Sequence, residues 1–303
     1  MNQLSLFPHD GISPLLLPRS IRTVIQPLVG ATRSNDPDGQ ASSARNRDQF
    51  YTRPDIAVEL FEWLLDEPHV QALLATGGAS FLEPSAGTGS FLRLLPPNTL
   101  AYDIEPKAPG IIEADFLTTI LPRGANFIVI GNPPFGKNAS MAVRFFNHAA
   151  LVAYVIAFIV PRTFQKLSIQ NRLDNAFHLC AEREVGRDAF IHDGAPKDVP
   201  TVFQIWVRQP WSRPRISLPL NHSDFEFTTA ERADFAFQRV GAKAGLVHRN
   251  FARSQSSNFF INPLVDGVEA TMKRLDFRKV ARRTAGNPSI SKAELVQLYG
   301  AAL

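Results

Sequence analysis

Residues 81–92 read Phe-Leu-Glu-Pro-Ser-Ala-Gly-Thr-Gly-Ser-Phe-Leu, and this stretch indicates the fold. An apolar pair leads into a carboxylate, a loop of small residues and a second apolar pair, which predicts a strand, a tight loop and the start of a helix. The glycines Gly87 and Gly89 let the backbone approach a ligand closely, and a helix N-terminus favours a carboxylate group. The loop lacks the Gly-Lys-Ser/Thr ending of a P-loop. Glu83, at the end of the strand, can meet the ammonium group of an amino acid.

The regions on both sides of this stretch alternate between short apolar runs and helical or loop segments. Residues 54–65 have helical apolar spacing, and Pro54 suits a first helical turn. Apolar runs follow at 81–82, 100–102, 127–130 and 154–160. This alternation predicts an α/β fold with a Rossmann-like parallel sheet and helices on both faces.

The pattern changes after Pro161. Residues 170–181 are expected to be helical. Two strands at 184–190 and 202–207 are expected to form an antiparallel pair that closes the sheet edge. The residues between them, 191–200, are expected to form a loop. Beyond Pro210, Pro214 and Pro219, we expect short strands at 225–227, 235–237 and 258–261 and helices at 266–277 and 291–299.

Two acidic residues beyond the glycine loop are candidates for contacts with a nucleoside. Asp103, about twenty positions beyond the start of the glycine loop, suits the two hydroxyls of a ribose, with Glu105 as the alternative. Asp115 could accept from an adenine amino group, and Phe116 could lie against the adenine ring.

The apolar run 127–131 ends in Asn132-Pro133-Pro134-Phe135. An amino group on a planar ring is a poor nucleophile, because its lone pair is delocalised. The Asn132 side-chain oxygen and the Pro133 carbonyl can each accept one of its N–H hydrogens, which favours a pyramidal nitrogen with an available lone pair. Phe135 can stack on the ring, a contact worth roughly 1–3 kcal/mol.

The composition describes a folded chain with a basic C-terminal end. The chain has 303 residues, 45% of them hydrophobic, and a formal charge of +4. Residues 211–303 hold fourteen Lys and Arg against eight Asp and Glu. We expect a flexible segment at 1–45, a main domain at 46–210 and a basic region at 211–303. The densest basic cluster is expected to contact nucleic-acid phosphates and comprises Lys273, Arg274, Arg278, Lys279, Arg282 and Arg283.

Several features favour a cytoplasmic protein without a metal. A single cysteine, Cys180, allows no disulfide framework. The N-terminus is not typical of a signal peptide, and the apolar run 149–160 is too short to span a bilayer. The histidines His148, His178 and His192 show no metal-ligand spacing.

The chain resembles the class I S-adenosylmethionine-dependent methyltransferases, and specifically the N6-adenine DNA methyltransferases. The resemblance covers about residues 49–208. It is carried by Tyr51-Thr-Arg-Pro54, Glu83-Pro-Ser-Ala-Gly-Thr-Gly89, Asp103-Ile-Glu-Pro106, Asp115-Phe116 and Asn132-Pro-Pro-Phe135 in this order.

The resemblance implies the following roles. Tyr51 and Thr52 border the methionine end of S-adenosyl-L-methionine, and Asp103 binds its ribose. Pro134 and Phe135 complete the catalytic loop with Asn132 and Pro133. The pocket is shaped by Glu83, Ala86, Gly87 and Gly89, with Asp115 and Phe116 around the adenine. Phe190 is expected to pack on the far face of the target base.

The implied activity is methyl transfer to adenine N6 in DNA without a metal. A stand-alone enzyme is expected, because no endonuclease or helicase motif is evident. Two alternatives use a similar loop. One is N6-adenine methylation of structured RNA, because the run Asn132–Asn138 strongly resembles the loop of some ribosomal RNA adenine methyltransferases. The other is methylation of a protein glutamine. Cytosine N4 methylation is a smaller possibility, and an inactive nucleic-acid-binding relic is another. Cytosine C5 methylation is disfavoured, because it needs a cysteine nucleophile and Cys180 is expected to be buried in an apolar helix. The recognition sequence and the oligomeric state stay open.

Overall fold

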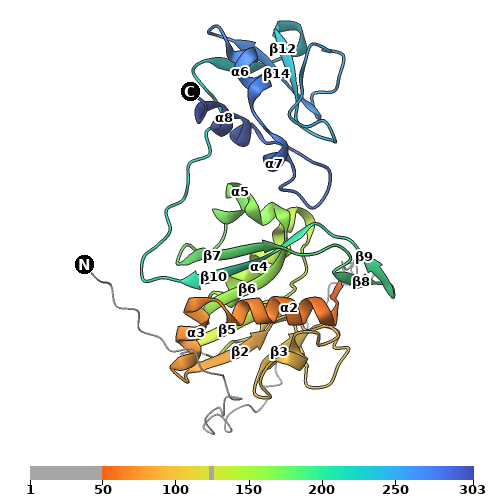
Figure 1. The fold of residues 1–303 in the computed structure, drawn as a ribbon, viewed down its shortest axis with the longest axis vertical. Coiled ribbons are helices and arrows are strands. Elements are labelled where there is room, and N and C mark those ends of the chain that lie inside the picture. Colours follow the sequence, from red (N-terminus) through yellow and green to blue (C-terminus); the bar gives the residue numbers. More distant parts are fainter. Residues whose placement is uncertain (1–49, 123–125) are drawn as a thin grey trace, which may run out of the picture.

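The computed structural model describes residues 50–122 and 126–303. The predicted flexible segment at 1–45 lies outside these residues. The described chain has a main part built on a large sheet and a smaller C-terminal part with a sheet of its own (Figure 1).

A seven-stranded sheet forms the centre of the main part. Its strands, in spatial order, are β4 (Ile112–Glu113), β3 (Leu100–Asp103), β2 (Ala79–Glu83), β5 (Asn126–Gly131), β6 (Ala153–Pro161), β10 (Thr201–Arg208) and β7 (Phe177–Glu184). The first five are parallel, and β10 runs antiparallel to both of its neighbours. This is the predicted Rossmann-like, mostly parallel sheet, closed at one edge by antiparallel strands.

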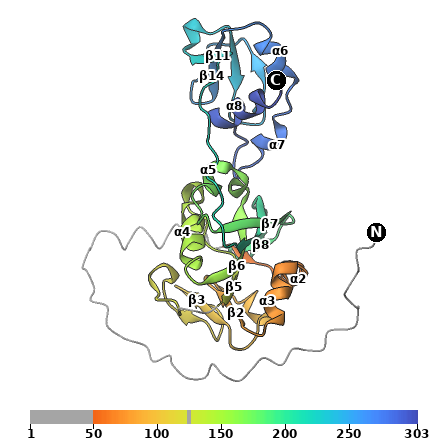
Figure 2. The same cartoon turned by 90° about the vertical axis from the view of Figure 1, so that its left-hand side faces the viewer.

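Helices cover both faces of this sheet (Figures 1 and 2). Buried residues of β6 alternate between the two faces: Val155, Ala157 and Ile159 belong to one apolar cluster, and Ile156, Phe158 and Val160 to the other. The first cluster is covered by α2 (Pro54–Leu65) and α3 (Pro68–Ala75), and the second by α4 (Ser140–Ala149). Strands buried on both faces are continuously apolar, which explains why these runs were evident in the sequence.

Strand β2 is the point where the strand order reverses, because the chain adds β3 on one side of it and β5 on the other. The loops that leave β2 and β5 therefore diverge at the carboxyl edge of the sheet, and such a crevice is where ligands bind in open α/β sheets. The glycine loop and the Asn-Pro-Pro-Phe loop are these two loops.

Two predicted elements between Pro161 and β10 are wrong. The helix expected at 170–181 is replaced by the short helix α5 (Leu167–Gln170), a turn in which Asp174 Oδ1 accepts from Ala176 N at 2.9 Å, and β7. The strand expected at 184–190 is mostly irregular, because β7 ends at Glu184 and Asp188 has a left-handed φ of 55°. Pairing with β10 decides the position of β7, and a half-exposed edge strand has little apolar pattern of its own.

The helix expected after the glycine loop is also shorter than a regular α-helix. Only a 3-10 turn, η1 (Leu92–Leu94), follows the loop. Pro96 explains the early end, because the residue before a proline is disfavoured in the helical region.

A second, three-stranded sheet joins the start of the described chain to the loop before β10. It pairs β1 (Tyr51–Thr52) with β8 (Phe190–His192), and β8 with β9 (Ala195–Lys197). The loop expected at 191–200 therefore contains a β-hairpin, and this hairpin holds β1 beside the carboxyl edge of the large sheet.

The C-terminal part has its own sheet and its own apolar core. The strands, in order, are β11 (Phe225–Thr228), β14 (Asn258–Pro263), β12 (Phe235–Gln238) and β13 (Val247–His248). The helices are α6 (Val268–Arg274), α7 (Arg278–Ala281) and α8 (Lys292–Gly300). Except for β13, these elements correspond to segments expected from the sequence or to its basic cluster. Their core forms a third apolar cluster, built around Phe225, Phe235 and Tyr299.

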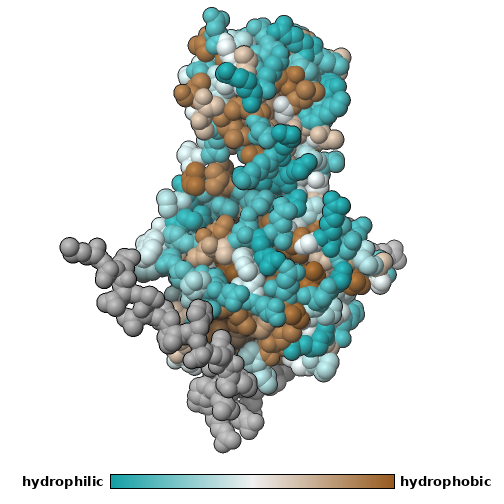
Figure 3. All heavy atoms as spheres, in the orientation of Figure 1, coloured by the Kyte–Doolittle hydropathy of each residue, from teal (hydrophilic) through white to brown (hydrophobic). Residues whose placement is uncertain are grey.

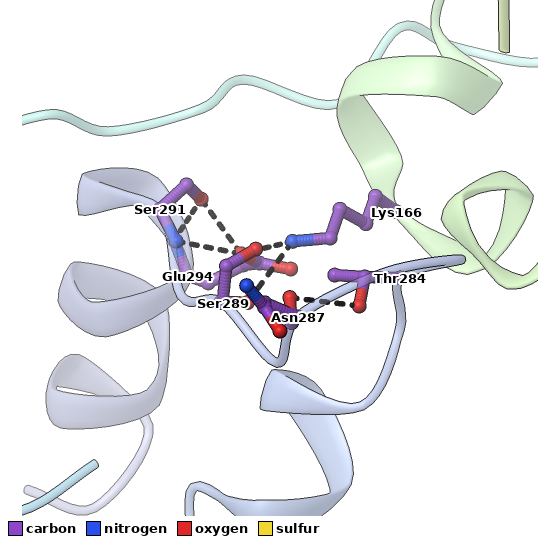
Figure 4. A network of polar contacts seen from close by, with 6 residues as sticks. All are labelled: Lys166, Thr284, Asn287, Ser289, Ser291 and Glu294. Atoms are coloured by element: carbon purple, nitrogen blue, oxygen red, sulfur yellow. Dashed lines mark hydrogen bonds and ion pairs between the residues drawn. The ribbon is translucent and has the colours of Figure 1, made fainter. Parts of the chain in front are cut away.

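One ion pair ties the two parts together (Figure 4). Lys166 Nζ lies 3.1 Å from Glu294 Oε2 and donates to the Ser289 carbonyl at 3.2 Å. Both charged side chains are only 14% exposed. Glu294 also completes a capping box with Ser291 at the start of α8. The contact therefore links the turn before α5 to the N-terminus of α8.

The surface in the orientation of Figure 1 is mixed. Figure 3 shows hydrophobic patches on both parts, separated by hydrophilic residues. Within the described ranges, no helix has the length and apolar character needed to cross a membrane.

We expect Lys166→Met to loosen the C-terminal part, because it leaves the Glu294 carboxylate half-buried without its cation. A lost hydrogen-bonded charge contact of this kind costs about 1–3 kcal/mol. Limited proteolysis of the connection at residues 209–224 should become faster in this variant. Lys197→Met, which removes an exposed lysine of β9, is the control. Equal cleavage rates for both variants would contradict the assigned role of the ion pair.

Candidate functional site

A cavity of about 400 Å³ lies at the carboxyl edge of the large sheet. Nearly all residues to which the sequence assigned a catalytic or cofactor role line it: Tyr51, Thr52, Glu83, Ala86, Gly87, Asp103, Asp115, Phe116, Asn132, Pro133, Pro134 and Phe135. Gly89 is not among the lining residues. The fold thus brings five separated sequence segments to one site.

The glycine loop is fixed against the end of β3. Ala86 N donates to the Tyr102 carbonyl at 2.9 Å, and Gly87 N donates to Asp103 Oδ2 at 2.7 Å. Gly87 has a φ of 50°, and a Cβ at this position would lie 2.9 Å from the Tyr51 ring. Only glycine fits this close approach, so the loop and β1 can pack together at the cavity wall.

Glu83 is a buried carboxyl group with a free oxygen at the cavity. The residue is 2% exposed, and its Oε2 has no hydrogen-bond partner within the described part of the chain. Burial raises the pKa of Glu83 well above its ordinary value of 4.5. A cationic group bound beside this carboxyl would restore its charged form. This fits the ammonium group of the cofactor that the resemblance implies.

The two acidic residues expected to hold a nucleoside are both engaged in loop turns. Asp103 accepts from Gly87 N at 2.7 Å and from Glu105 N at 2.8 Å, one bond to each carboxylate oxygen. Asp115 accepts from Leu117 N at 2.9 Å. Each carboxylate oxygen has more than one lone-pair direction, so both groups can still accept from a ligand hydroxyl or amino group.

Phe116 lies mainly in the core beneath the cavity. It is 1% exposed, and its ring packs edge-on against His148, with centroids 4.8 Å apart. Tyr102 and Phe145 complete its surroundings. Phe116 lines the cavity, but little of its ring is open to a ligand.

The Asn-Pro-Pro-Phe loop is held at both ends. The Phe135 carbonyl accepts from Met141 N and Ala142 N, at 3.2 and 3.3 Å, in the first turn of α4. Ser85 Oγ donates to the Asn132 carbonyl at 3.1 Å. The loop is therefore anchored to the glycine loop on one side and to α4 on the other.

The Asn132 side chain presents an acceptor to the cavity. Its Nδ2 donates to the Phe50 carbonyl at 2.7 Å, whereas its Oδ1 is buried and lacks a hydrogen-bond partner among residues 50–122 and 126–303. Buried acceptors are normally paired, so an orphaned one in a cavity indicates a ligand with an N–H or O–H group.

Sequence reasoning missed several residues that line the cavity, including Phe50, Ser90, Ile104, Met141 and Phe145. The Phe50 ring lies 6.5 Å from that of Phe135 and 5.0 Å from that of His192, measured between centroids. Phe50 directly precedes the recognised segment Tyr51–Pro54, and this adjacency was the only available signal.

The expected base contact of Phe190 is wrong. Phe190 is 0% exposed and belongs to the core cluster beneath α2, where its ring packs against Phe50. A fully buried ring offers no face to a base. Phe50, which precedes β1 and packs against Phe190, lines the cavity instead.

The expected surroundings of Cys180 are also wrong, although the argument against cytosine C5 methylation stands. Cys180 lies exposed on strand β7 and does not line the cavity. Partial desolvation and the nearby Glu67 carboxylate raise its pKa, which favours the unreactive thiol.

Glu67, His69 and Cys180 form a group whose ligand atoms lie within 4.8 Å of one another. Glu67 is already engaged there: Oε1 lies 2.8 Å from His69 Nδ1, and Oε2 accepts from the backbone N–H groups of His69 and Val70. Because this carboxylate caps helix α3, we assign no metal to the group.

The basic cluster is divided between paired and exposed groups. Lys273 lies 2.8 Å from Glu269, and Arg278 lies 2.9 Å from Asp276. Lys279 and Arg282 are exposed, Arg283 is half-buried, and the exposed Arg274 lies 3.4 Å from the Thr271 hydroxyl. Helix α7 and the segment after it lie at the end of the C-terminal part that faces the main part (Figure 1).

Comparisons with known proteins give only distant likenesses. No family model matches the chain, and no curated protein matches it. Among solved structures, the chain is similar to PH1948 from Pyrococcus horikoshii, which is described as a candidate RNA methyltransferase. The identity is 20%, and the alignment covers 53% of this chain and 87% of that chain with a TM-score of 0.40.

Two further structures are similar over the same share of the chain. For the 23S rRNA methyltransferase ErmE the identity is 18%, the coverage 55% of this chain and 72% of that chain, and the TM-score 0.36. For the DrdV–DNA complex the identity is 16%, the coverage 53% of this chain and 26% of that chain, and the TM-score 0.30. Likenesses this distant carry no argument about the substrate.

We expect the Glu83 carboxyl to make the ligand-free protein less stable as the pH rises. Its pKa is higher in the folded protein than in the unfolded chain, so folding favours the protonated form. The stabilisation is complete below about pH 4.5 and is lost as the pH rises through the raised pKa. Glu83→Gln cannot ionise, so its stability relative to the natural protein should increase with pH. Melting temperatures between about pH 4 and pH 8 measure this difference. Glu113→Gln, at an exposed position of β4, is the control. A difference in melting temperature between the Glu83 variant and the natural protein that stays constant with pH would contradict the assigned direction of the pKa shift.

Proposed function

We propose that this protein transfers a methyl group from S-adenosyl-L-methionine to the N6 amino group of adenine in DNA. The observation that carries the proposal is the Asn132 side chain, whose buried Oδ1 acceptor has no partner in the described residues and whose Nδ2 is held by the Phe50 carbonyl. An acceptor fixed in this way suits a neutral amino group, which has hydrogens to donate.

The other side of the cavity fits the cofactor. The Glu83 carboxyl would meet the ammonium group, and Thr52 offers a buried hydroxyl that also lacks a partner in the described part of the chain. Asp103 would accept from the ribose hydroxyls, with Asp115 near the adenine. When bound, the cofactor supplies an already activated methyl group, so the protein contributes positioning and electrostatics.

Asn132 and Pro133 would hold the target nitrogen. Accepting both N–H hydrogens withdraws the lone pair from the ring and directs it away from the two acceptors. Phe135 is 8% exposed and lines the same cavity, where its ring can support the target base. Asn132 Oδ1 is buried, so a base stacked inside a duplex cannot reach it. The base must therefore leave the duplex, at a cost of a few kcal/mol.

The assay measures transfer of labelled methyl from S-adenosyl-L-methionine to duplex DNA, ribosomal RNA and mixed protein, with the labelled product digested and identified. N6-methyladenine from DNA is the expected product. Label found only in RNA or in glutamine would overturn the DNA assignment and retain the site. Cofactor binding without label in any substrate would favour the inactive relic.

We expect Asn132→Ala to reduce methyl transfer by roughly 100- to 1000-fold, as loss of one well-placed polar contact does in other enzymes. Cofactor affinity, measured by calorimetry, should change little, because Asn132 lies on the target side. Asn98→Ala, in an exposed turn far along the chain from the loop, is the matched control. Near-normal turnover of the Asn132 variant would refute the assigned site.

We expect the exposed cations Lys279 and Arg282 to contact phosphates, because the nearby Lys273 and Arg278 already have acidic partners. Changing both exposed cations to Gln should make the negative slope of log affinity against log salt shallower by about 1–2. Each duplex phosphate contact contributes about 0.9 to the magnitude of this slope. Arg144→Gln with Arg215→Gln removes the same charge from exposed positions elsewhere. A slope equal to that of this control would mean that the cluster is an ordinary solvated surface without phosphate contacts.

A further inference from the structure

The two ends of the Asn132 amide are chemically opposite, and only one orientation suits the proposed reaction. A backbone carbonyl can only accept, so the amide atom 2.7 Å from the Phe50 oxygen must be the NH2 group. This places Oδ1 at the other end, where it is buried without a partner in the described segments. A reversed amide would present a donor to the target amino group, which is itself a donor.

The Phe50 carbonyl owes its position to strand β1. β1 pairs with β8 through Tyr51 and Thr52, and Arg53 N donates to the Ala189 carbonyl at 3.0 Å just beyond it. On the opposite side, Ser90 Oγ donates to the Thr52 carbonyl at 2.6 Å. Ser90 is 7% exposed, so water does not compete strongly for this contact.

Ser90 belongs to the glycine loop, so the contact connects three segments. The glycine loop holds β1 through Ser90, β1 presents the Phe50 carbonyl, and this carbonyl orients the Asn132 amide. Ser85 of the same loop also donates to the Asn132 backbone. The loop that lines the cofactor side of the cavity is thus connected to the acceptor on the target side.

We propose that Ser90 is a positioning residue that acts through strand β1 and the Phe50 carbonyl to hold Asn132 with its oxygen toward the target nitrogen. This inference deepens the proposed function and, for its catalytic consequence, rests on it. The geometry itself can be tested without any substrate.

The first test measures the exchange of the Asn132 side-chain amide hydrogens with solvent by NMR, in the ligand-free protein. Ser90→Ala should speed this exchange at least tenfold, because strand β1, which carries the Phe50 carbonyl, keeps its pairing with β8 but loses its attachment to the glycine loop. Ser90→Thr keeps the hydroxyl and should restore slow exchange. The Asn147 amide, which donates to the Arg172 carbonyl at 3.0 Å, is the internal control and should not change. Unchanged exchange at Asn132 in Ser90→Ala would overturn the proposal.

The second test uses the pH dependence of methyl transfer by Asn132→Asp. A protonated carboxyl group can donate to the Phe50 carbonyl and accept from the target nitrogen, whereas an ionised one has no hydrogen to donate. The variant's rate should fall tenfold per pH unit above the pKa of the new carboxyl, while the rate of the natural protein stays level. A variant rate that is level or rises with pH, or that is absent throughout, would contradict the required donor contact.

The exchange measurement and the methyl-transfer assay of the natural protein separate the inference from the function. If Ser90→Ala speeds exchange at Asn132 but the natural protein methylates no substrate, the positioning contact is real and the proposed function is wrong. If methylation occurs and exchange does not respond to Ser90, the function stands and this inference fails.

Discussion

The site depends on the pairing of strand β2 between β3 and β5. Parallel hydrogen bonds join β2 to both neighbours, and the chain reaches them in opposite directions. Because of this reversal, the loops after β2 and β5 separate and leave a cavity at the carboxyl edge. A sheet in which strands were added in one direction only would cover this edge with connecting segments, and Glu83 and Asn132 would not face a common space.

The cavity contains polar groups whose hydrogen bonds are incomplete in the protein alone. The oxygens concerned are Glu83 Oε2, Thr52 Oγ1 and Asn132 Oδ1, each without a partner among the described residues. Desolvating such groups costs free energy that other parts of the fold must offset. The apolar clusters on the two faces of the sheet supply this stability, since strands β5 and β6 are buried on both sides. A rigid sheet thus supports a locally unfavourable site, as expected where ligands complete the bonding.

The C-terminal part is attached through polar contacts. Its apolar cluster shares no residue with the clusters of the main part, and the pair of Lys166 and Glu294 is the charged contact at the junction. Folded parts with separate apolar cores can move relative to each other unless their interface is large and hydrophobic. In the proposed function, this freedom would let the basic α7 region adjust to a nucleic acid while the cavity stays unchanged.

The sequence alone indicated the parallel strands β2, β3, β5 and β6 and most of the cavity residues between Glu83 and Phe135. Strands buried on both faces must be apolar throughout, and tight loops require particular residues such as Gly87. The positions of β7, Phe190 and Cys180 were decided only by the tertiary structure. An edge strand carries a weak pattern, so pairing with β10 selects its residues, and pairing of β1 with β8 turns Phe190 inward and brings Phe50 to the cavity. The Phe50 contact with Asn132 joins residues 82 positions apart through a backbone oxygen. Every residue has such an oxygen, so no residue type in the sequence could indicate this contact.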